Sequence, residues 1–443
     1  MPQTLPSFSK EEINLFATQS YQDVCFAVVS KFTDGVLPQQ ELRAMIDRAY
    51  SSFTHKAVLP LKQVSHNHYM AEMFYGETFA FKDFALSLLG QMIEYFVKIK
   101  NKKAVIIGAT SGDTGSAAIY GCKNLDAASV YILFPRGMVS QFQKMQMVST
   151  GSPSVYPLEV DGTFDDCQNI VKDLFVDEDF LSKLGKDLVA VNSVNFMRIL
   201  AQAVYYFYTC SRLNQGCKIA VSVPSGNFGN IYSAMLAKQM GLKIDKFIVA
   251  TNKNDILYRF FNAGDYSVKQ ISPTISPSID ISIASNFERF LYSALNCNAD
   301  LTAAKMQDLK SFGKITFSAA ELNALTQNFV AFKAQEDDMK QEIQNLYNLT
   351  CEVSEPHTAA GLYAANCFLK AQEAQGYLVI TFATASGVKF SDAVLSAGVP
   401  AHALEATMPA IITAKKQSNQ QQKCYNLPAK HDLIKDFILQ SQC

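Results

Sequence analysis

Residues 104–118 read AVIIGATSGDTGSAA and join an apolar strand, through a glycine-rich turn, to the start of a helix. A short apolar run without polar alternation is typical of a strand that is buried on both faces of a parallel sheet. The same order of strand, turn and helix recurs along the chain. The expected strands are residues 104–108, 130–134, 155–160, 188–192, 219–223, 247–251 and 377–384. We therefore expect an α/β fold in which helices cover parallel sheets.

Length and composition narrow the class of protein. The chain has 443 residues, which predicts two lobes with appendages. Its 39 basic and 40 acidic residues nearly cancel, so no net charge would attract nucleic acid or an anionic membrane. The sequence shows no signal-peptide pattern and no membrane-spanning run, and its ten cysteines lack metal-ligand spacing. We expect a cytoplasmic protein with reduced, mostly buried thiols, no metal, and no nucleic-acid or membrane partner.

The pattern divides the chain into three parts. An N-terminal segment, residues 1–75, is expected to be mostly helical, and a polar loop with a terminal helix occupies residues 416–443. The central region, residues 76–415, holds the repeated strands, with a smaller lobe over approximately 100–215. Between residues 255 and 350 the strand pattern stops, which predicts a helical insertion.

Lys82 lies in the stretch AFKDFALSLLG, residues 80–90, where a helical pattern begins among phenylalanines. Aromatic neighbours and the positive end of a helix both disfavour the ammonium form and predict a lowered pKa. A neutral amine is what Schiff-base chemistry requires. The alternative is a lysine that packs its stem on the aromatic rings and keeps its amine in water. Asp83 would oppose the lowered pKa if its carboxylate faced the amine.

Two glycine-rich loops are candidate anion sites. Residues 108–118 place backbone amides and hydroxyls at a helix N-terminus, although a tight turn with Asp113 as the helix cap would look the same. Residues 223–234 read VPSGNFGNIYSA and again follow an apolar strand. On neighbouring strands of one parallel sheet, both loops would lie at the carboxyl edge. They predict a ligand with two phosphates, or a phosphorylated cofactor beside an anionic substrate.

Further polar residues follow other strands. Asn192, Asn195 and Arg198 recur at three-residue spacing and would share a helix face, where Arg198 could grip a phosphate or form a surface salt bridge. Thr384 ends a buried strand and could contact a ligand ring, although threonine is common in strands. His357 is expected to have a structural role.

Six motifs occur in the order typical of one enzyme family: AFKDF, GATSGDTG, the Asn/Asn/Arg group, SVPSGNFGN, SEPH and TFATASGVKF. With them the sequence resembles the threonine synthases, which are pyridoxal-phosphate (PLP) enzymes of fold type II. The resemblance runs from about residue 5 to the C-terminus. It implies two lobes with parallel-rich, twisted sheets covered by helices, an N-terminal segment, and a PLP-dependent catalytic region that carries the helical insertion.

The resemblance also implies a role for each motif residue. Lys82 would be the Schiff-base lysine and proton shuttle, Thr384 would bond the pyridine nitrogen, and Asp113 would contact the ring hydroxyl. The cofactor phosphate would be held by Gly226, Asn227, Phe228, Gly229 and Asn230. The substrate phosphate would be held by Ser111, Thr114, Asn192 and Arg198.

The implied reaction converts O-phospho-L-homoserine and water to L-threonine and phosphate by γ-elimination and β-addition. One alternative is a diverged phospholyase that releases a 2-oxo acid, ammonia and phosphate, and another is a non-catalytic PLP-binding relative. The partner would be a small phosphorylated amino acid, and the protein would be a monomer or homodimer.

The sequence departs from the family pattern in three places. FYGET, residues 74–78, stands where relatives usually read FHGPT, which introduces Tyr75 and Glu77. ASGVKF, residues 385–390, stands for AHPAKF and introduces Ser386 and Gly387. A carboxylate at position 77 could repel an anionic substrate. The N-terminal arm that relatives carry is expected to be shortened.

Overall fold

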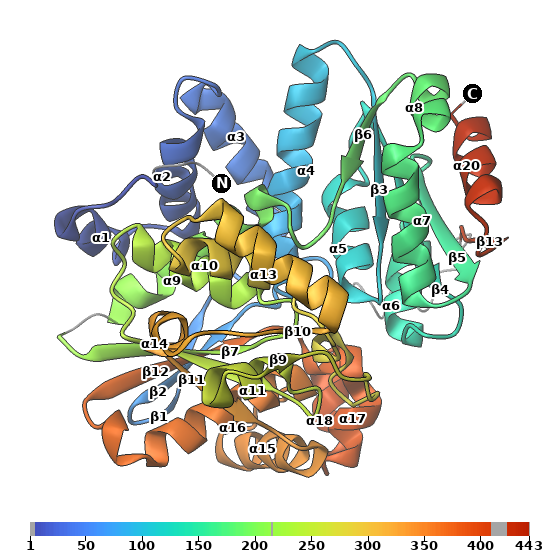
Figure 1. Ribbon diagram of the computed structural model, residues 1–443. Coiled ribbons are helices and arrows are strands. Elements are labelled where there is room, and N and C mark those ends of the chain that lie inside the picture. The colour runs from blue at the N-terminus through green and yellow to red at the C-terminus, as the bar shows by residue number, and fades with distance from the viewer. Residues whose placement is uncertain (1–4, 214–215, 409–422, 443) are drawn as a thin grey trace. The chain divides into compact units, whose positions relative to one another are not determined.

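The computed structural model describes residues 5–213, 216–408 and 423–442 (Figure 1). Residues 416–422, which belong to the predicted polar loop, lie outside the described residues. Contacts divide the chain into two compact units. Unit 1 consists of residues 1–36, 55–75 and 199–407, and unit 2 consists of residues 37–54, 76–198 and 408–443.

Unit 2 is built on a five-stranded sheet in which every neighbouring pair is parallel. Its strands are, in spatial order, β13 (Tyr425–Pro428), β5 (Val155–Asp161), β4 (Ala128–Pro135), β3 (Ala104–Ala109) and β6 (Asp187–Ala190). Ile106 contributes to the hydrophobic core on one face, whereas Val105 and Ile107 contribute to the core on the other. Both faces are therefore buried, which explains the uninterrupted apolar run of β3.

Helices cover both faces of this sheet. One core contains residues of α4 (Lys82–Ile99), α5 (Asp113–Cys122) and α6 (Gln141–Val148). The other contains residues of α7 (Phe164–Val176), α8 (Glu178–Leu184) and α20 (His431–Gln440). In addition, α3 (Gln39–Tyr50) packs on α4, where the Tyr50 hydroxyl donates a hydrogen bond to the carbonyl of Phe84.

Helices α4 and α5 approach each other unusually closely. A side chain at Gly90 would overlap the carbonyl of Gly121, and one at Gly121 would overlap the carbonyl of Leu86. Only glycine allows backbones to come this near. The contact fixes the two helices against each other, and with them Lys82 and Asp113, which are their first residues.

Unit 1 is built on a six-stranded sheet in which β1 and β2 are antiparallel and all other pairs are parallel. Its strands are, in spatial order, β1 (Leu61–Ser65), β2 (His68–Glu72), β12 (Tyr377–Ala383), β7 (Lys218–Pro224), β8 (Lys246–Thr251) and β11 (Phe329–Lys333). A separate two-stranded sheet pairs β9 (Tyr266–Ser267) with β10 (Lys314–Ile315).

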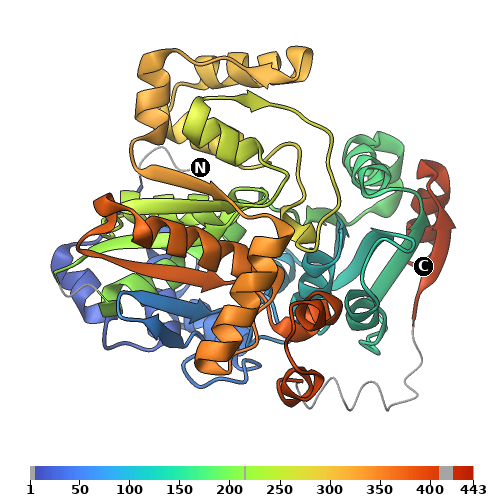
Figure 2. The same ribbon diagram turned by 90° about the horizontal axis from the view of Figure 1, so that it is seen from below.

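The larger sheet of unit 1 is also covered on both faces. Helix α16 (Pro356–Lys370) packs on β7, β8 and β12, with α15 (Glu336–Thr350) beside it (Figures 1 and 2). On the other face lie α9 (Phe196–Leu213) and α10 (Gly229–Gln239), and Tyr205 and Tyr206 of α9 contact Phe382 of β12. Helices α1 (Lys10–Phe16) and α2 (Tyr21–Thr33) pack on α9 through aromatic contacts.

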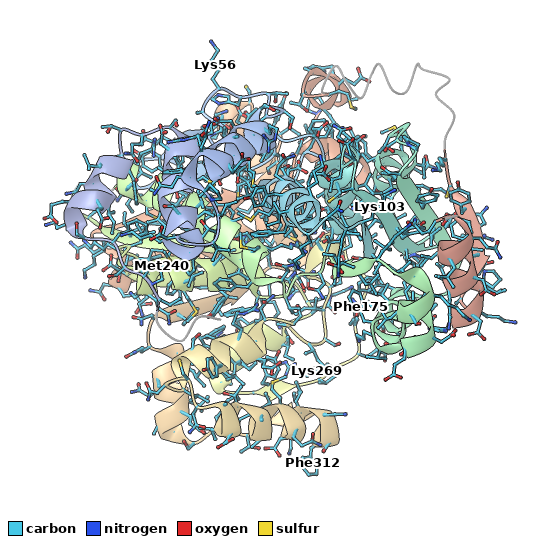
Figure 3. All side chains as sticks on the ribbon, turned by 90° about the horizontal axis from the view of Figure 1, so that it is seen from above. Lys56, Lys103, Phe175, Met240, Lys269 and Phe312 are labelled. Carbon is cyan, nitrogen blue, oxygen red and sulfur yellow. The ribbon has the colours of Figure 1, made fainter. Side chains whose placement is uncertain are left out.

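Shorter helices complete unit 1. They are α11 (Ile256–Ala263), α12 (Phe287–Ala294), α13 (Ala299–Phe312), α14 (Ala319–Thr326), α17 (Ser391–Ser396), α18 (Ala401–Ala406) and the 3-10 turns η1 (Pro277–Ile279), η2 (Gln372–Ala374) and η3 (Gly387–Phe390). Packed phenylalanine rings join α11 and α12 to the end of β11. Phe312, at the end of α13, is 72% exposed, and Figure 3 shows its side chain at the outside of the helix.

All seven predicted strands are present, and the fold is the expected α/β architecture. Three predictions need correction. Strands β1 and β2 accompany helices α1, α2 and α3 in the segment predicted to be mostly helical. The predicted insertion does contain helices α11 to α15, but the strands do not stop there, since it also holds β9, β10 and β11. The glycine-rich loops do not share a sheet, because β3 belongs to the sheet of unit 2 and β7 to the larger sheet of unit 1. The predicted domain boundaries were continuous ranges, whereas each unit combines three separate stretches of chain. The boundaries therefore stay predictions.

The nine cysteines within the described residues are free. Four of them are buried, and Cys297 and Cys351 are exposed, so the prediction that most thiols are buried was wrong. In the part of the chain that the structure describes, no helix is both long and apolar enough to cross a bilayer.

Candidate active site

Lys82 is the first residue of α4 and lies in unit 2. Its side chain is 9% exposed, and its Nζ lies 5.4 Å from the centre of the Phe81 ring. The alternative in which the amine stays in water therefore does not hold. The aromatic surroundings and the helix start are those that the sequence predicts.

Asp113 is the ion-pair partner of Lys82. Its Oδ2 lies 3.5 Å from the lysine Nζ, and both side chains are buried. A carboxylate at this distance favours the charged form of the amine and opposes the two influences on which the sequence prediction rests. Asp113 is the first residue of α5, and the cap position is Gly112 without a side-chain cap bond, so the alternative in which Asp113 caps the helix was wrong.

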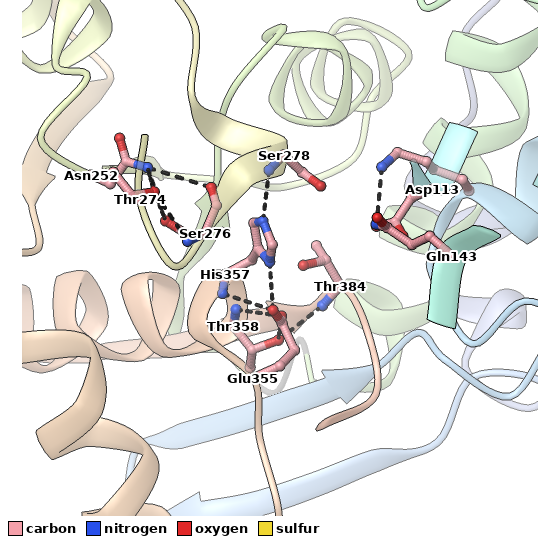
Figure 4. Close-up of polar contacts among 11 residues, drawn as sticks. Asp113, Gln143, Asn252, Thr274, Ser276, Ser278, Glu355, His357, Thr358 and Thr384 are labelled. Carbon is pink, nitrogen blue, oxygen red and sulfur yellow. Dashed lines mark hydrogen bonds and ion pairs between the residues drawn. The ribbon is translucent and has the colours of Figure 1, made fainter. Parts of the chain in front are cut away.

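Gln143 holds the Asp113 carboxylate from behind. Its Nε2 donates to Asp113 Oδ1 at 2.9 Å (Figure 4), and its Oε1 accepts from the backbone amide of Ser140 at 3.1 Å. Gln143 is 3% exposed, and a side chain at Gly112 would overlap it. Because both ends of the amide are bonded, the orientation of Gln143 is fixed. The sequence analysis missed this residue, although the S-x-x-Q spacing from Ser140 is a helix-start signal.

The Asp83 carboxylate contacts the turn before α4. Its Oδ2 accepts from the backbone amide of Thr78 at 2.8 Å, and its Oδ1 accepts from the Thr78 hydroxyl at 2.5 Å. A side chain at Gly76 would overlap the Asp83 carboxylate. Asp83 therefore helps to shape the turn that leads to Lys82.

The loop after β3 is organised by Thr110. Its hydroxyl oxygen accepts from the amides of Gly112 at 2.9 Å and of Gly115 at 2.8 Å. These two amides are therefore engaged within the loop. Ser111 is exposed and Thr114 is half-buried, so both present hydroxyls at the carboxyl end of β3.

The loop after the neighbouring strand β6 contains the next predicted substrate residues. Helix α9 begins only at Phe196, so the prediction that Asn192, Asn195 and Arg198 share a helix face was wrong. Asn192 and Asn195 form the turn before α9, and Asn195 Oδ1 accepts from the amide of Met197 at 2.9 Å. Arg198 is 2% exposed, which excludes a surface salt bridge. Because β6 pairs with β3 in parallel, both loops lie at one sheet edge.

The second glycine-rich loop lies in unit 1, between β7 and α10. A side chain at Gly226 would lie 2.7 Å from the carbonyl oxygen of Ser278, and Phe228 has a φ of 63°. The amide of Gly229 donates to Asn227 Oδ1 at 2.9 Å. The following amides of the first turn of α10 have no partner inside the helix by geometry, which is the arrangement that anion sites at helix starts use.

Asn230 in this turn carries an unsatisfied donor. Its Oδ1 accepts from the hydroxyls of Tyr205 and Tyr206. Its Nδ2 is buried and has no hydrogen-bond partner among the described residues. A buried donor without an acceptor is unfavourable, so this amide could donate to an acceptor atom of a ligand.

Thr384 directly follows β12, the strand beside β7 in the sheet of unit 1. Its backbone amide donates to the Thr358 hydroxyl at 3.2 Å, and that hydroxyl donates to Glu355 Oε1 at 2.7 Å. Parallel pairing places Thr384 and the loop after β7 at the same carboxyl edge. Glu355 was missed in the sequence, where SEPH contributed only to the resemblance.

The residues that depart from the family pattern have local partners. Glu77 forms an ion pair with Lys123 at 2.5 Å. The Tyr75 hydroxyl donates to Glu72 Oε2 at 2.8 Å, and burial is the main reason that the pKa of Tyr75 is raised. A side chain at Gly387 would lie 2.7 Å from Val353 Cγ1. Each change is thus accommodated within its own unit.

The structure therefore brings the predicted residues together in two groups. Unit 2 joins Lys82 to Asp113 and places Ser111, Thr114 and Asn192 at one sheet edge. Unit 1 places residues 226–230 and Thr384 at another. Their individual roles stay predictions.

Family comparisons cover most of the chain. Residues 60–306 match the model of pyridoxal-phosphate dependent enzymes. Residues 1–50 match the threonine synthase N terminus, and residues 358–438 match the threonine synthase C-terminal model.

Individual relatives agree with these matches. The threonine synthase of Pseudomonas aeruginosa is 36% identical over 442 residues, which cover 99% of this chain and 92% of that protein. The solved PLP-bound threonine synthase of Brucella melitensis is 38% identical, with a TM-score of 0.93 over 100% of this chain and 93% of that one. The solved yeast threonine synthase is 34% identical, with a TM-score of 0.92 over 100% and 92%. The chain belongs to the threonine synthase family of PLP-dependent enzymes.

Proposed function

We propose that the chain converts O-phospho-L-homoserine and water to L-threonine and phosphate, with Lys82 as the residue that carries PLP and shuttles protons. The observation that carries this proposal is the buried Lys82 amine at the start of α4, 3.5 Å from the Asp113 carboxylate. A buried lysine that is paired with a carboxylate is the type of group that enzymes use as a switchable acid and base.

The residues of unit 1 suit the cofactor. The phosphate would bind at residues 226–230, where the Asn230 Nδ2 lacks an acceptor and Gly226 leaves room for close backbone approach. Thr384 would bond the pyridine nitrogen, and Asp113 of unit 2 would contact the ring hydroxyl. When bound, PLP supplies an electron sink for the negative charge that develops on the substrate carbon atoms.

Lys82 and Asp113 would share the proton transfers. The Lys82 Nζ would take protons from the α and β carbons of the substrate and return protons at the γ and α carbons, while phosphate leaves the γ carbon and water adds at the β carbon. Asp113 stabilises the lysine when its amine is charged, and Gln143 keeps the carboxylate turned toward it. These steps need a lysine that alternates between its neutral and charged forms. The aromatic surroundings and the helix start favour the neutral form, and the Asp113 carboxylate favours the charged form.

The substrate phosphate would bind at the carboxyl edge of β3 and β6. Ser111 and Thr114 would donate from their hydroxyls, and Asn192 from its side-chain amide. The guanidinium group of Arg198 could bind two phosphate oxygens at once. Donors at this position stabilise the charge on the phosphate as it leaves. Glu77 does not add a free negative charge nearby, because Lys123 neutralises it.

Two measurements test the proposal. The purified protein should show the visible absorbance of bound PLP, and the Lys82→Ala variant should lack it after dialysis. With O-phosphohomoserine, threonine and phosphate should appear in equal amounts. A 2-oxo acid and ammonia in place of threonine would establish the phospholyase alternative. An intact absorbance band with no phosphate release would instead indicate the non-catalytic alternative.

The substrate class is a small phosphorylated amino acid. A monomeric or homodimeric state and a cytoplasmic location stay predictions from the sequence, and size-exclusion chromatography with light scattering measures the first.

A further inference from the structure

Glu355 is a fully buried carboxylate whose exposed fraction is 0%. Its Oε2 accepts from the backbone amide of His357 at 2.8 Å and lies 2.5 Å from His357 Nδ1. Its Oε1 accepts from the amide and the hydroxyl of Thr358, both at 2.7 Å. Each carboxylate oxygen is thus bonded to two groups of the first turn of α16. Glu355 is therefore an anchor to which two neighbouring side chains are bonded.

His357 extends from this anchor toward the phosphate loop. Its Nε2 lies 2.9 Å from the backbone nitrogen of Ser278 (Figure 4). A backbone amide can only donate, so Nε2 must be the acceptor and the ring proton must sit on Nδ1, where it is donated to Glu355. The carbonyl of Ser278 in turn faces Gly226 so closely that no other side chain fits there. The position of His357 thus fixes the segment that forms one wall of the Gly226 loop.

Thr358 extends from the same anchor toward Thr384. Because its hydroxyl proton is donated to Glu355, its oxygen is turned to accept from the Thr384 amide at 3.2 Å (Figure 4). That bond fixes the backbone of the first residue after β12. Glu355 therefore controls two segments that are distant in sequence, and both are predicted to hold the cofactor.

We infer that Glu355 is a positioning residue for PLP: through His357 and Ser278 it sets the loop predicted to bind the cofactor phosphate, and through Thr358 it sets the residue predicted to bond the pyridine nitrogen. The inference rests on the proposed function. It goes further, because one carboxylate that is not predicted to contact the cofactor or the substrate would position both the phosphate-binding loop and Thr384. Glu355 is also the N-cap of α16, but a cap alone would stabilise the helix without positioning these two segments.

The test measures binding of PLP and of pyridoxal, which lacks the phosphate, to the apoprotein of each variant. Glu355→Gln offers one acceptor oxygen where two are needed, so PLP affinity should fall by about tenfold or more. His357→Phe keeps a ring but removes both nitrogens, and it should weaken PLP more than pyridoxal. Thr358→Val removes the hydroxyl at constant shape, and it should shift the absorption maximum of bound PLP and weaken both ligands alike.

Conservative variants supply the controls. His357→Gln can still accept from Ser278, so it should keep most of the binding that His357→Phe loses. Thr358→Ser keeps the hydroxyl, so it should keep most of the binding that Thr358→Val loses. The inference is overturned if Glu355→Gln binds PLP within twofold of the wild type. It is also overturned if all variants lose affinity only in proportion to their loss of thermal stability, without rescue. If Glu355→Gln does not fold, the two matched pairs decide the question.

The experiment separates this inference from the proposed function. A wild-type protein that does not bind PLP would contradict the proposed function itself. A wild-type protein that binds PLP, with variants that bind equally well, would contradict the role of Glu355 alone.

Discussion

Unit 2 and unit 1 hold their predicted functional groups in different ways. In unit 2 two charged side chains, Lys82 and Asp113, face each other directly at the starts of two helices. In unit 1 the predicted contacts are the backbone-rich loop 226–230 and the short side chain of Thr384. Groups that exchange protons are titratable side chains, whereas groups that only hold a ligand can be backbone amides on a rigid frame.

Both units nevertheless use the same supporting device. A buried polar side chain, Gln143 in unit 2 and Glu355 in unit 1, is hydrogen-bonded at both of its ends and lies one layer behind the predicted contacts. Fully bonded buried groups fix a unique arrangement, and partly bonded ones do not. In both units, the groups predicted to contact ligands are therefore held in position by a buried side chain that is not itself predicted to contact a ligand.

The largest expected effect is that of Lys82→Ala. Activity should fall more than about 1,000-fold, because the variant loses both the cofactor attachment and the proton shuttle. Steady-state rates and visible spectra check this. The exposed Lys56, which Figure 3 shows projecting outward, provides the control, and Lys56→Ala should keep the wild-type rate and spectrum. Substantial threonine formation by Lys82→Ala would contradict the view that unit 2 supplies the proton-transfer group while unit 1 only binds the cofactor.

The second prediction concerns the sheet of unit 1. Burial lowers the pKa of His68 to about 4, and its Nε2 lies 2.7 Å from the Thr381 hydroxyl in β12. The unfolded chain binds this proton near pH 6.5, so acidification favours unfolding and stability is lost as pH falls from about 6.5 to 4. At pH 5 the loss from His68 should be about 2 kcal/mol.

Hydrogen exchange, corrected for the intrinsic rate, checks this unit by unit. Between pH 7 and pH 5, protection should fall more in β12 of unit 1 than in β3 of unit 2. His68→Gln should remove most of the difference. Equal losses in both strands would show that the acid sensitivity does not originate at His68.

Gln143→Leu tests the support of unit 2. The variant keeps a similar volume but removes the donor to Asp113 Oδ1, so the rate should fall about tenfold, which corresponds to one hydrogen bond to a charged group. Asp113→Asn should cost more, because it removes the charge itself. Measurements of kcat and KM should place the Gln143→Leu loss mainly in kcat. An effect on KM alone would mean that Gln143 supports substrate binding and not the Lys82–Asp113 pair.

The smallest expected effect is that of Glu77→Gln. Lys123 lies 2.5 Å from the Glu77 carboxylate, so the negative charge that the variant removes is already neutralised. The KM for O-phosphohomoserine should therefore change less than about threefold. Lys123→Gln leaves the carboxylate unpaired and should raise KM more, and the double variant should return it toward the wild type. A large fall in KM in Glu77→Gln would show that the carboxylate repels the substrate.

The strands that the sequence predicted are those with continuous apolar runs, such as β3 and β7, because burial on both faces leaves a local pattern. Strands β1 and β11 were missed for opposite reasons. LKQVS in β1 is a partly exposed edge strand with polar residues, and FVAFK in β11 continues a run that also suits a helix. The spacing of Asn192, Asn195 and Arg198 fits either a helix face or a capping turn, and only the observed turn before α9 distinguishes them.

By itself the sequence determined the α/β class, the position of Lys82 at a helix start, the glycine-rich loops and the family. These follow from apolar runs, helix signals and motifs that extend over a few residues. Only the tertiary structure decided that β3 and β7 belong to different sheets, that Asp113 meets Lys82, and that Glu355 supports two separate segments. The physical reason is that strand order and buried polar networks depend on contacts between residues far apart in the chain, which leave no local periodicity.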